Sequence, residues 1–584
     1  MHVTVRCYYT TLLDACDKKS KESRNFCFSL KHTNMSALFL FNRFPNELFY
    51  EIFEYLTSYD ILYAFKGLNQ RIDLLLQNYS KYRFNFQSCT KSQFDFVCKS
   101  ITCEQIQSLI LADSDDTCQQ IRTFFQLFYI RKCINIESLN LIEITEQNLS
   151  KLLPKIKFLP KLTCLSIDLK NSLIPNIEFG SSLKSLSVTT CSMSRLCELL
   201  LSVPLLTKLN VELITDDTNR IVNSSLTTNI HQLKIKLRPK SNVTFNEIGL
   251  LFQWMPKLKQ LTFIAIRGMR FVHGNQWESL IRMYLSDLKQ FHFAIHPNLQ
   301  HHYISQNLST FQTPFWLEEK QWIIHCNYYS YVDYHLGNLC RTNFYTLPYC
   351  DEQFELFFST KTLTTPCKSQ YATVKNLYFS IDDGARKNIN DNYYFSNLNS
   401  LTIRNLYKPL SIDTFIDLST IKHLTIEQGN PINPEECFSY LLMHTTNLQS
   451  LKLTWRSLVE IAHHFKNQEV CSILSKQIKF LSLIDIISEK EDNGETRQAL
   501  EKLSQIFSSN LIKLSISVMS FDNIVFIFEQ MFQLSSLKFE YNARSNIDSI
   551  QLWLKRNIPR LKNFTYEVRS INEKRTCWLL WIGR

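Results

Sequence analysis

The chain has 584 residues, of which 45% are hydrophobic and 20% charged. This length exceeds that of one compact domain, so we expect several domains or one elongated array of repeats. The formal net charge of +11 is spread along the chain rather than gathered into one basic face, which argues against a nucleic-acid-binding protein.

The cysteines and the N-terminal segment both favour a cytoplasmic or nuclear location. The 18 cysteines include no C-x-x-C pair and no spacing typical of zinc ligands, which indicates reduced thiols and no bound metal. Residues 1–40 lack the apolar core and cleavage site of a secretion signal, so we expect a flexible leader, in which Met35 is a second candidate start. No window reaches the about 18 apolar residues that a membrane span requires, so no membrane contact is expected.

A first short helix is predicted just after this leader. Pro45 suits its first turn, where no backbone N–H is needed, and Glu47 lies near the positive end of the helix dipole. Leu48, Ile52, Phe53 and Leu56 recur at helical spacing and form one apolar stripe. We expect this stripe to stay open to another protein.

Two further short helices are predicted from their capping residues. Thr57 and Asp60 form a capping-box pattern, so a second helix is expected to begin there and to end near Gly67. Asn69 is the expected cap of a third helix, whose Ile72 faces inward. A segment of roughly forty residues cannot bury a self-sufficient core, so something else must cover these helices.

The three predicted helices resemble the F-box, a motif that begins with Leu-Pro, continues with a glutamate and spaced aliphatic residues, and then reaches an Asp-Leu segment. Phe44 stands where the motif has leucine, and Asp60 with Ile61 matches the Asp-Leu segment. The resemblance covers residues 41–80 and implies that these helices bind a Skp-type adaptor, which links them to a cullin and its ubiquitin ligase. The residues that it implies for the adaptor contact are Phe44, Pro45, Glu47, Leu48, Ile52 and Leu56. The alternative is an ordinary helical cap on the downstream array.

A repeated pattern fills most of the remaining chain. Residues 81–135 connect the helices to it and hold a weaker first copy at Ile106, and over residues 136–584 the copies follow at spacings of roughly 21 to 33 residues, the range of leucine-rich repeats. Each copy has apolar residues on both sides of one middle residue, which is typical of a strand whose middle side chain faces water. The middle residues are Asn140, Ser166, Ser187, Asn210, Lys234, Thr262, His292, Tyr378, Thr402, Thr425, Lys452, Ser482, Ser515, Lys538 and Thr565.

The segments between these strands have the pattern of helices. Several end in an apolar residue followed by proline, which stops a helix and favours an extended backbone. These prolines are Pro160, Pro204, Pro256 and Pro559. The array resembles irregular leucine-rich repeats, although the asparagine or cysteine usual after each strand is mostly missing, as at Ile144 and Ile214, so we expect variable curvature.

The expected fold class is therefore α/β. We expect an N-terminal three-helix F-box, followed by a leucine-rich-repeat-like solenoid with parallel strands on its concave face and helices outside. A plain α/β domain is the alternative to the solenoid.

Two stretches depart from the repeat. Residues 296–373 are rich in aromatic residues and histidine, and the alternation from Trp322 to Tyr328 indicates a strand within a packed insertion or degenerate repeats. A metal site there is the alternative, although the spacings match no ligand pattern. Near the C-terminus, residues 577–582 are expected to pair with the strand around Phe564 and to close the last open edge of the array.

The sequence contains no motif of catalysis or nucleotide binding, so we expect neither an enzyme nor a cofactor. The preferred function is that of the substrate-recognition subunit of a Skp-cullin-F-box type ubiquitin ligase, in which the array binds the target protein. The residues favoured for the target contact, because long or aromatic side chains offer most contact, are Lys234, His292, Tyr378 and Lys452. A leucine-rich-repeat scaffold without a ligase role is the alternative, and an enzyme within the aromatic insertion is a third hypothesis.

Overall fold

The computed structural model describes residues 44–170, 174, 180, 182–214, 227–239, 241–333, 337–357, 360–364, 371–380, 393–404, 412–427, 434–484, 493–517, 521–541, 547–558, 563–572 and 575–583. The leader expected over residues 1–40, with Met35, lies outside these residues, as does Pro559. The chain divides into two compact units, Met1–Lys170 with Ile177–Leu183, and Asn171–Asn176 with Lys184–Arg584. The helices expected in residues 41–80 thus share one unit with the start of the repeats.

Three short helices open the described part of the first unit, as the sequence predicted. They are α4 (Asn46–Tyr55), α5 (Ser58–Phe65) and α6 (Gln70–Asn78). The side chains of Thr57 and Asn69 each accept a backbone hydrogen bond at the start of α5 and α6, so both predicted caps are confirmed. Gly67 has a φ of 78°, the left-handed conformation that suits the turn between these two helices. Pro45 is the N-cap of α4 rather than part of its first turn.

Parallel strands follow within the same unit. They are β1 (Tyr82–Asn85), β2 (Ile106–Ala112), β3 (Ser138–Ile144) and β4 (Cys164–Leu169), and they pair in this order. The helices between and after them are α7 (Lys91–Cys98), α8 (Gln120–Leu127) and α9 (Glu146–Ile156). The sequence pattern does not predict β1, because its four residues are too few to show the repeat.

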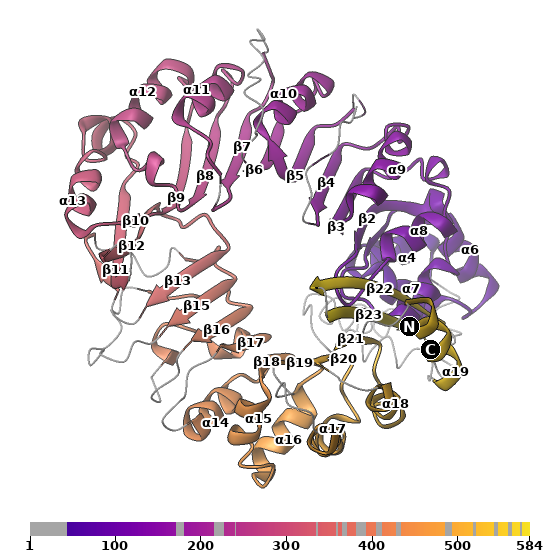
Figure 1. Ribbon diagram of the computed structural model, residues 1–584. Helices are drawn as coiled ribbons and strands as arrows, with labels where there is room; N and C mark the ends of the chain where they lie inside the picture. The colour runs from indigo at the N-terminus through magenta and orange to yellow at the C-terminus, as the bar shows by residue number, and fades with distance from the viewer. Residues whose placement is uncertain are drawn as a thin grey trace, which may run out of the picture. The chain divides into compact units, whose positions relative to one another are not determined.

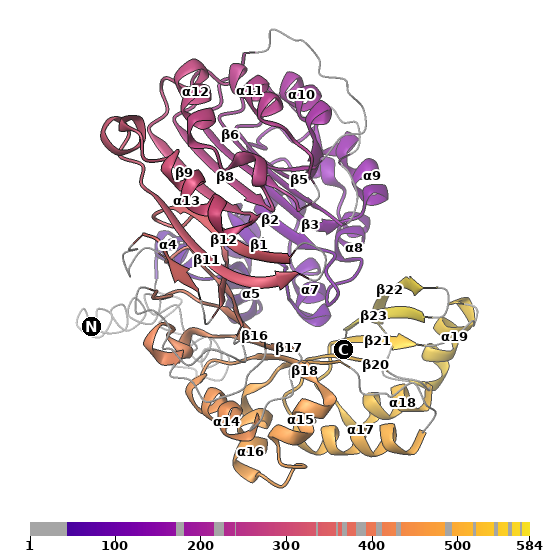
Figure 2. The same ribbon diagram turned by 60° about the vertical axis from the view of Figure 1, so that its left-hand side comes forward.

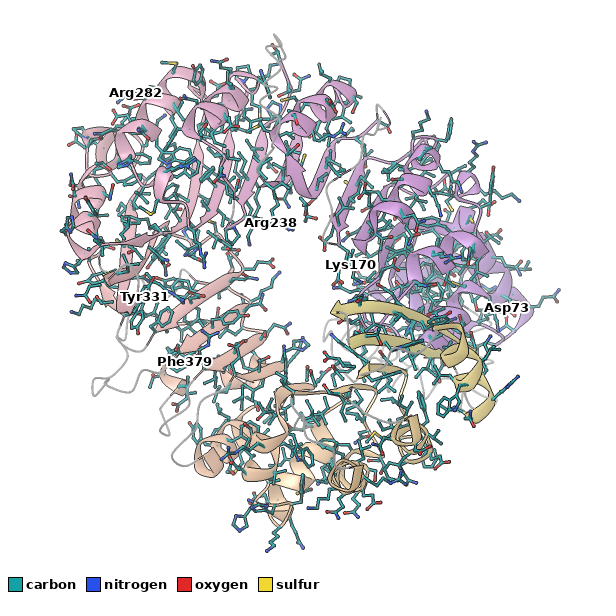
Figure 3. All side chains as sticks on the ribbon, in the orientation of Figure 1. Asp73, Lys170, Arg238, Arg282, Tyr331 and Phe379 are labelled. Carbon is teal, nitrogen blue, oxygen red and sulfur yellow. The ribbon has the colours of Figure 1, made fainter. Side chains whose placement is uncertain are left out.

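The second unit begins with parallel strands that pair in chain order. They are β5 (Ser185–Ser192), β6 (Lys208–Ile214), β7 (Gln232–Leu237), β8 (Gln260–Ile266) and β9 (Gln290–His296). One side of this sheet is covered by α10 (Met193–Ser202), α11 (Phe245–Gln253) and α12 (Gly274–Tyr284), as Figure 1 shows. Figure 3 places Arg282 of α12 on this helical side and Arg238, just after β7, on the open side.

Helices lie between many of the strands, as the sequence predicted, but the described residues between β16 and β17 form only two short 3-10 helices, Ile412–Thr414 and Leu418–Thr420. In α11, Ile248, Leu251 and Phe252 are all buried, so one face of this helix belongs to the core. Three of the four predicted prolines lie just after helices α9, α10 and α11, and these are Pro160, Pro204 and Pro256. None of the helices in the described ranges combines the length and the apolar character needed to cross a membrane.

The aromatic segment departs from the parallel order. Its elements are β10 (Asn298–Leu299), α13 (His301–Ser309), β11 (Ile324–Asp333), β12 (Gly337–Thr346) and β14 (Lys361–Thr362). Strand β12 runs antiparallel to β9, β10 and β11, and β11 also pairs with β14. The predicted strand is confirmed from Ile324 onward. The phenol groups of Tyr345 and Tyr371 form a buried hydrogen bond of 2.8 Å, so this segment is a packed part of the core.

A second sheet occupies the C-terminal part of the second unit. Its strands pair in the order β13 (Gln353–Phe357), β15 (Asn376–Ser380), β16 (Ser400–Arg404), β17 (His423–Glu427), β18 (Ser450–Thr454), β19 (Phe480–Ile484), β20 (Lys513–Ser517), β21 (Ser536–Tyr541), β23 (Arg575–Gly583) and β22 (Asn563–Asn572). The helices are α14 (Pro434–His444), α15 (Trp455–Ile461), α16 (Gln468–Gln477), α17 (Asn493–Phe507), α18 (Phe521–Gln530) and α19 (Ile547–Asn557). Figure 2 shows α14 to α18 on one side of this sheet.

The C-terminal strand pairs as predicted but lies elsewhere in the sheet. Phe564 of β22 stands opposite Ile582 of β23, which confirms the pairing. However, β23 lies between β21 and β22 and runs antiparallel to both, so β22 and not the C-terminal strand forms the edge. The C-terminal strand β23 therefore runs opposite to the repeat strands, because the short connection from Asn572 to Arg575 leaves no room for the crossover that parallel strands need.

At many of the parallel strands, one backbone carbonyl holds the start of a strand to the start of the next. The carbonyl of Lys259, for example, accepts hydrogen bonds from the N–H groups of Lys289 and Gln290 at 2.9 and 3.1 Å. The same pair of bonds recurs at the carbonyls of Glu137, Lys184, Thr207, His231, Glu352, Lys375, Asn399, Lys422, Gln449, Lys479 and Ile512. We call this row of bonds the strand-start ladder. It keeps successive parallel strands in one register.

We predict that Gly274→Ala destabilises the second unit. A Cβ atom at Gly274 would collide with the backbone carbonyl of Thr310, while the Gly274 N–H already donates to the Thr310 hydroxyl oxygen at 2.7 Å. Overpacking of this kind costs about 1–3 kcal/mol of unfolding free energy, to be measured by urea unfolding of the full chain. Gly249→Ala is the control, because its Cβ would first meet the flexible side chain of Leu280. Equal stability of the two variants would contradict the prediction.

Candidate functional site

The helices of the first unit are built around an aromatic core. Phe49 and Phe53 lie one turn apart on α4, and both are buried. Their rings pack against Phe65 of α5 at centroid distances of 6.2 and 5.4 Å. Phe53 also contacts Tyr79, and Tyr79 contacts Tyr82 of β1. The phenylalanines therefore decide which face of α4 points inward.

Arg71 of α6 fixes the start of α4. Its guanidinium donates to the side-chain oxygen of Asn46 from Nε at 3.1 Å and from Nη2 at 2.7 Å. Nη2 also donates to the backbone carbonyl of Phe44, and the guanidinium lies 5.8 Å from the ring centroid of Phe49. One side chain thus holds both ends of the first helical turn.

The six residues expected at the adaptor contact differ in their exposure to solvent. Pro45 and Glu47 are exposed, Phe44, Leu48 and Leu56 are half-buried, and Ile52 is only 7% exposed. The expectation that Ile52 stays open to another protein is therefore not met, because its side chain lies on the inward face of α4. Two exposed apolar residues were missed by the sequence pattern, Tyr55 at 62% and Leu74 at 51%. Tyr55 stands seven residues after Leu48, a spacing that places both on one face of α4.

The helices are tied to the strands that follow them. Ser58, at the start of α5, accepts a hydrogen bond from the N–H of Arg83 in β1 at 2.7 Å. The side-chain amide of Gln105 donates to carbonyls at the C-terminal end of α6 at distances from 2.6 to 3.3 Å. These carbonyls belong to Leu76, Gln77 and Tyr79. The first strands of the chain itself thus supply part of the cover that the small helical segment needs.

A cavity of about 580 Å³ opens between α4, α5, β1 and α7 in the first unit. The rings of Tyr59 and Tyr63 line it and stack at 5.7 Å. Glu54 and Lys81 also line it and form an exposed ion pair of 3.0 Å. Burial, with Glu54 nearby, raises the pKa of the lining residue Tyr79 to about 12, so its phenol is neutral at pH 7. The walls combine apolar rings with polar groups, the composition that suits a side chain of a bound partner.

The middle residues of the repeats lie side by side on the strands. All fifteen fall within β3 to β9 or β15 to β22. In the first sheet of the second unit the register places Thr262 between Lys234 and His292. In the second sheet, Thr402 follows Tyr378 in the same way. Thr402 is only 8% exposed, so the expectation that every middle residue faces water is wrong at this position.

The four residues favoured for the target contact lie in two pairs. Lys234 and His292 are two strands apart in the first sheet of the second unit, and Tyr378 and Lys452 are three strands apart in the second sheet. Tyr378 and Lys452 are exposed, whereas Lys234 and His292 are half-buried. Burial lowers the pKa of His292, so this ring is neutral at pH 7. The sheets thus offer polar but mostly uncharged rows for contact with a protein.

We also searched the described residues for a metal site and compared the sequence with known proteins. Within the described ranges, no group of three or more histidine, cysteine or carboxylate residues is placed to hold a metal ion. No protein-family model matches the chain, and no curated protein matches its sequence at a significant level. The function of these surfaces is therefore argued from their own residues.

We predict that Arg71→Ala loosens α4. Loss of the hydrogen bonds to Asn46 and Phe44 should cost about 1–3 kcal/mol locally, because a charged donor is removed. Hydrogen exchange of the α4 amides should then be roughly tenfold or more faster, while exchange in β2 stays unchanged. Lys66→Ala, which removes an exposed cation from the turn after α5, is the control. Unchanged exchange in α4 would show that Arg71 does not hold this helix.

We predict that His292 titrates below the ordinary histidine pKa of about 6.5, because burial disfavours the charged ring. The unfolded chain binds this proton more readily than the folded chain, so stability is kept above about pH 6.5 and lost as pH falls toward the lower folded pKa. The measurement is histidine NMR on the full chain, with His292→Gln to assign the signal and His273→Gln as an exposed control. A titration midpoint at or above about 6.5 would contradict the prediction.

Proposed function

We propose that this protein is the substrate-recognition subunit of a Skp-cullin-F-box type ubiquitin ligase, acting in the cytoplasm or nucleus. The observation that carries the proposal is the start of α4, where Pro45 and Glu47 are exposed and Leu48 is half-buried. Arg71 holds this helix start in place through Asn46. A rigid helix end with an apolar side chain and a solvated carboxylate suits docking on a partner protein.

The adaptor contact is proposed to run along the outer face of α4. Leu48 and Tyr55 share that face, and the exposed carboxylates of Glu47 and Glu51 border them. Ile52 is excluded from the contact because it is buried. A Skp-type adaptor bound here would connect the chain to a cullin and to the catalytic subunits of the ligase.

The strands are proposed to bind the target protein. Their parallel register and the strand-start ladder support an irregular leucine-rich-repeat-like solenoid. The favoured contacts remain Lys234, His292, Tyr378 and Lys452, of which Tyr378, at 42% exposure, offers the largest open ring. The chain itself would catalyse nothing: holding the target near a charged conjugating enzyme raises its effective concentration for ubiquitin transfer.

A leucine-rich-repeat scaffold without a ligase role is the second candidate, and one observation favours it. Gln105 and Ser58 tie the helices to their own first strands, as a cap on the repeats would be tied. The two functions differ in one respect, which is whether the outer face of α4 holds an adaptor.

We predict that the full-length protein binds a purified Skp-type adaptor and that Pro45→Ala combined with Leu48→Ala weakens this binding about tenfold or more. Neither side chain belongs to the buried core, so the double substitution should remove contacts without unfolding the helices. The measurement is isothermal titration calorimetry. The full chain is used because Gln105 and Arg83, outside the helical segment, hold the helices in place.

Two variants serve as controls for this experiment. Leu127→Ala removes an apolar side chain that is 60% exposed on α8 and should leave adaptor binding unchanged. Ile52→Ala should instead lower the unfolding free energy by about 2–5 kcal/mol, as buried isoleucines do. A folded wild-type chain that never retains the adaptor would remove the ligase function and leave the scaffold.

A further inference from the structure

A row of lysines marks the strand starts in the first sheet of the second unit. The segments that lead into β5 to β9 are residues 182–185, 204–208, 229–232, 256–260 and 286–290. Their charged residues are five lysines and one carboxylate, namely Lys184, Lys208, Lys257, Lys259, Lys289 and Asp287, all of them exposed. We call these five segments the basic edge.

The strand-start ladder fixes the geometry of the basic edge. Parallel strands lie about 4.8 Å apart, so the five strand starts extend over roughly 19 Å. The carbonyls of Lys184 and Lys259 each accept two hydrogen bonds from the next strand. The backbone there is already engaged, so the edge can meet a partner only through its side chains.

A row of glutamines accompanies the lysines. Gln232, Gln260 and Gln290 are the first residues of β7, β8 and β9, and the register places them side by side. No hydrogen bond from these side-chain amides is found within the described residues, and Gln232 and Gln290 are exposed. A glutamine side-chain amide donates from its NH2 group and accepts at its oxygen, so it can pair with both the C=O and the N–H of a peptide bond.

The strand starts elsewhere in the chain differ in charge from one another. In the first unit, the corresponding segments before β2, β3 and β4 carry Glu104, Glu137 and Lys161, which is a mixture of signs. In the second sheet, Lys375 is paired with Glu352 at 2.6 Å. Lys422, Lys479 and Lys513 likewise stand at the starts of β17, β19 and β20, with no carboxylate in the same segments, so the strand starts of β5 to β9 are set apart by the row of glutamines that accompanies their lysines.

We propose that the basic edge binds an extended acidic segment of a partner protein. Each exposed ion pair contributes little alone, but a fixed row of lysines engages several carboxylates of one chain together. An extended peptide advances about 3.3 Å per residue, so roughly six residues cover the row. The lysines meet the carboxylates, and the glutamines meet the peptide groups between them.

The residues of the basic edge favour a peptide over a nucleic acid. Its five segments contain no phenylalanine, tyrosine or tryptophan on which a base could stack. This inference deepens the proposed function, since it names the class of partner that the array would present. It is tested without adaptor, so its failure and a failure of adaptor binding are separate results.

The test uses the full-length protein and a fluorescein-labelled octaglutamate peptide, with binding followed by fluorescence anisotropy at low salt and at about 0.15 M salt. The combined change Lys184→Glu, Lys259→Glu and Lys289→Glu should weaken binding about tenfold or more. The matched control reverses three exposed lysines of the second unit that lie outside the basic edge and away from strand starts, Lys466, Lys502 and Lys555, and should change binding by less than about twofold. If the reversed variant is less stable in thermal unfolding, the same three lysines are changed to glutamine instead.

Two further probes separate the sources of negative charge. A polyacrylate oligomer of equal charge, which lacks peptide groups, should bind about threefold more weakly than octaglutamate. A labelled oligouridine should bind more weakly than octaglutamate as well. The proposal is overturned if octaglutamate does not bind at low salt, if charge reversal at the basic edge has no more effect than the control, or if either other polyanion binds as tightly as the peptide.

Discussion

The parallel sheets of this protein depend on one repeated hydrogen-bond arrangement, in which a carbonyl just before a strand accepts two N–H bonds from the start of the next strand. At Thr207 and at His231, the carbonyl accepts bonds from the next strand start while the N–H of the same residue donates to the carbonyl before it, Lys184 or Thr207. Such paired bonds leave few buried backbone groups unsatisfied. They also fix the register, because a strand that slipped by one residue would lose both bonds and turn its apolar residues to the wrong face.

The strand-start ladder can hold successive repeats together where the expected side-chain amides are missing. The asparagine or cysteine expected after each strand is missing at Ile144 and Ile214. Side-chain amides that hold a repeat together must keep their identity in every copy, whereas a backbone carbonyl is present whatever the side chain. The residue at the ladder position therefore varies freely, from Glu137 to Lys259 to Ile512. Repeats of unequal length remain paired because only the strand start is constrained.

Alternation predicts the strands well because burial on one face of a sheet enforces it directly. Every middle residue lies in a strand, and the caps at Thr57 and Asn69 are also found, since both patterns are local. Features set by distant contacts were missed. The stripe from Leu48 to Leu56 gave the wrong orientation for Ile52, because Phe49 and Phe53 pack on Phe65 and rotate the helix. Strands β1 and β13 were missed because each comes just before a run of clear repeats. The place of β23 in the sheet depends on its hairpin with β22, which the repeat period does not predict.

The hydrogen bonds that set the strand register use backbone atoms, so the side chains at these positions are free to vary. Binding surfaces can arise where side chains vary in this way. The core needs apolar residues beside each middle position, and the ladder needs only backbone atoms. Most middle residues and the side chains at the strand starts are less constrained by the fold, although Thr402 is buried and Asn210 donates to Ser187 on the neighbouring strand. The helical segment is similar, because Arg71 and Gln105 hold it through hydrogen bonds to backbone carbonyls. The side chains on the outer face of α4 take no part in these bonds. Surfaces that the fold does not need are the ones whose composition has to be explained by a partner.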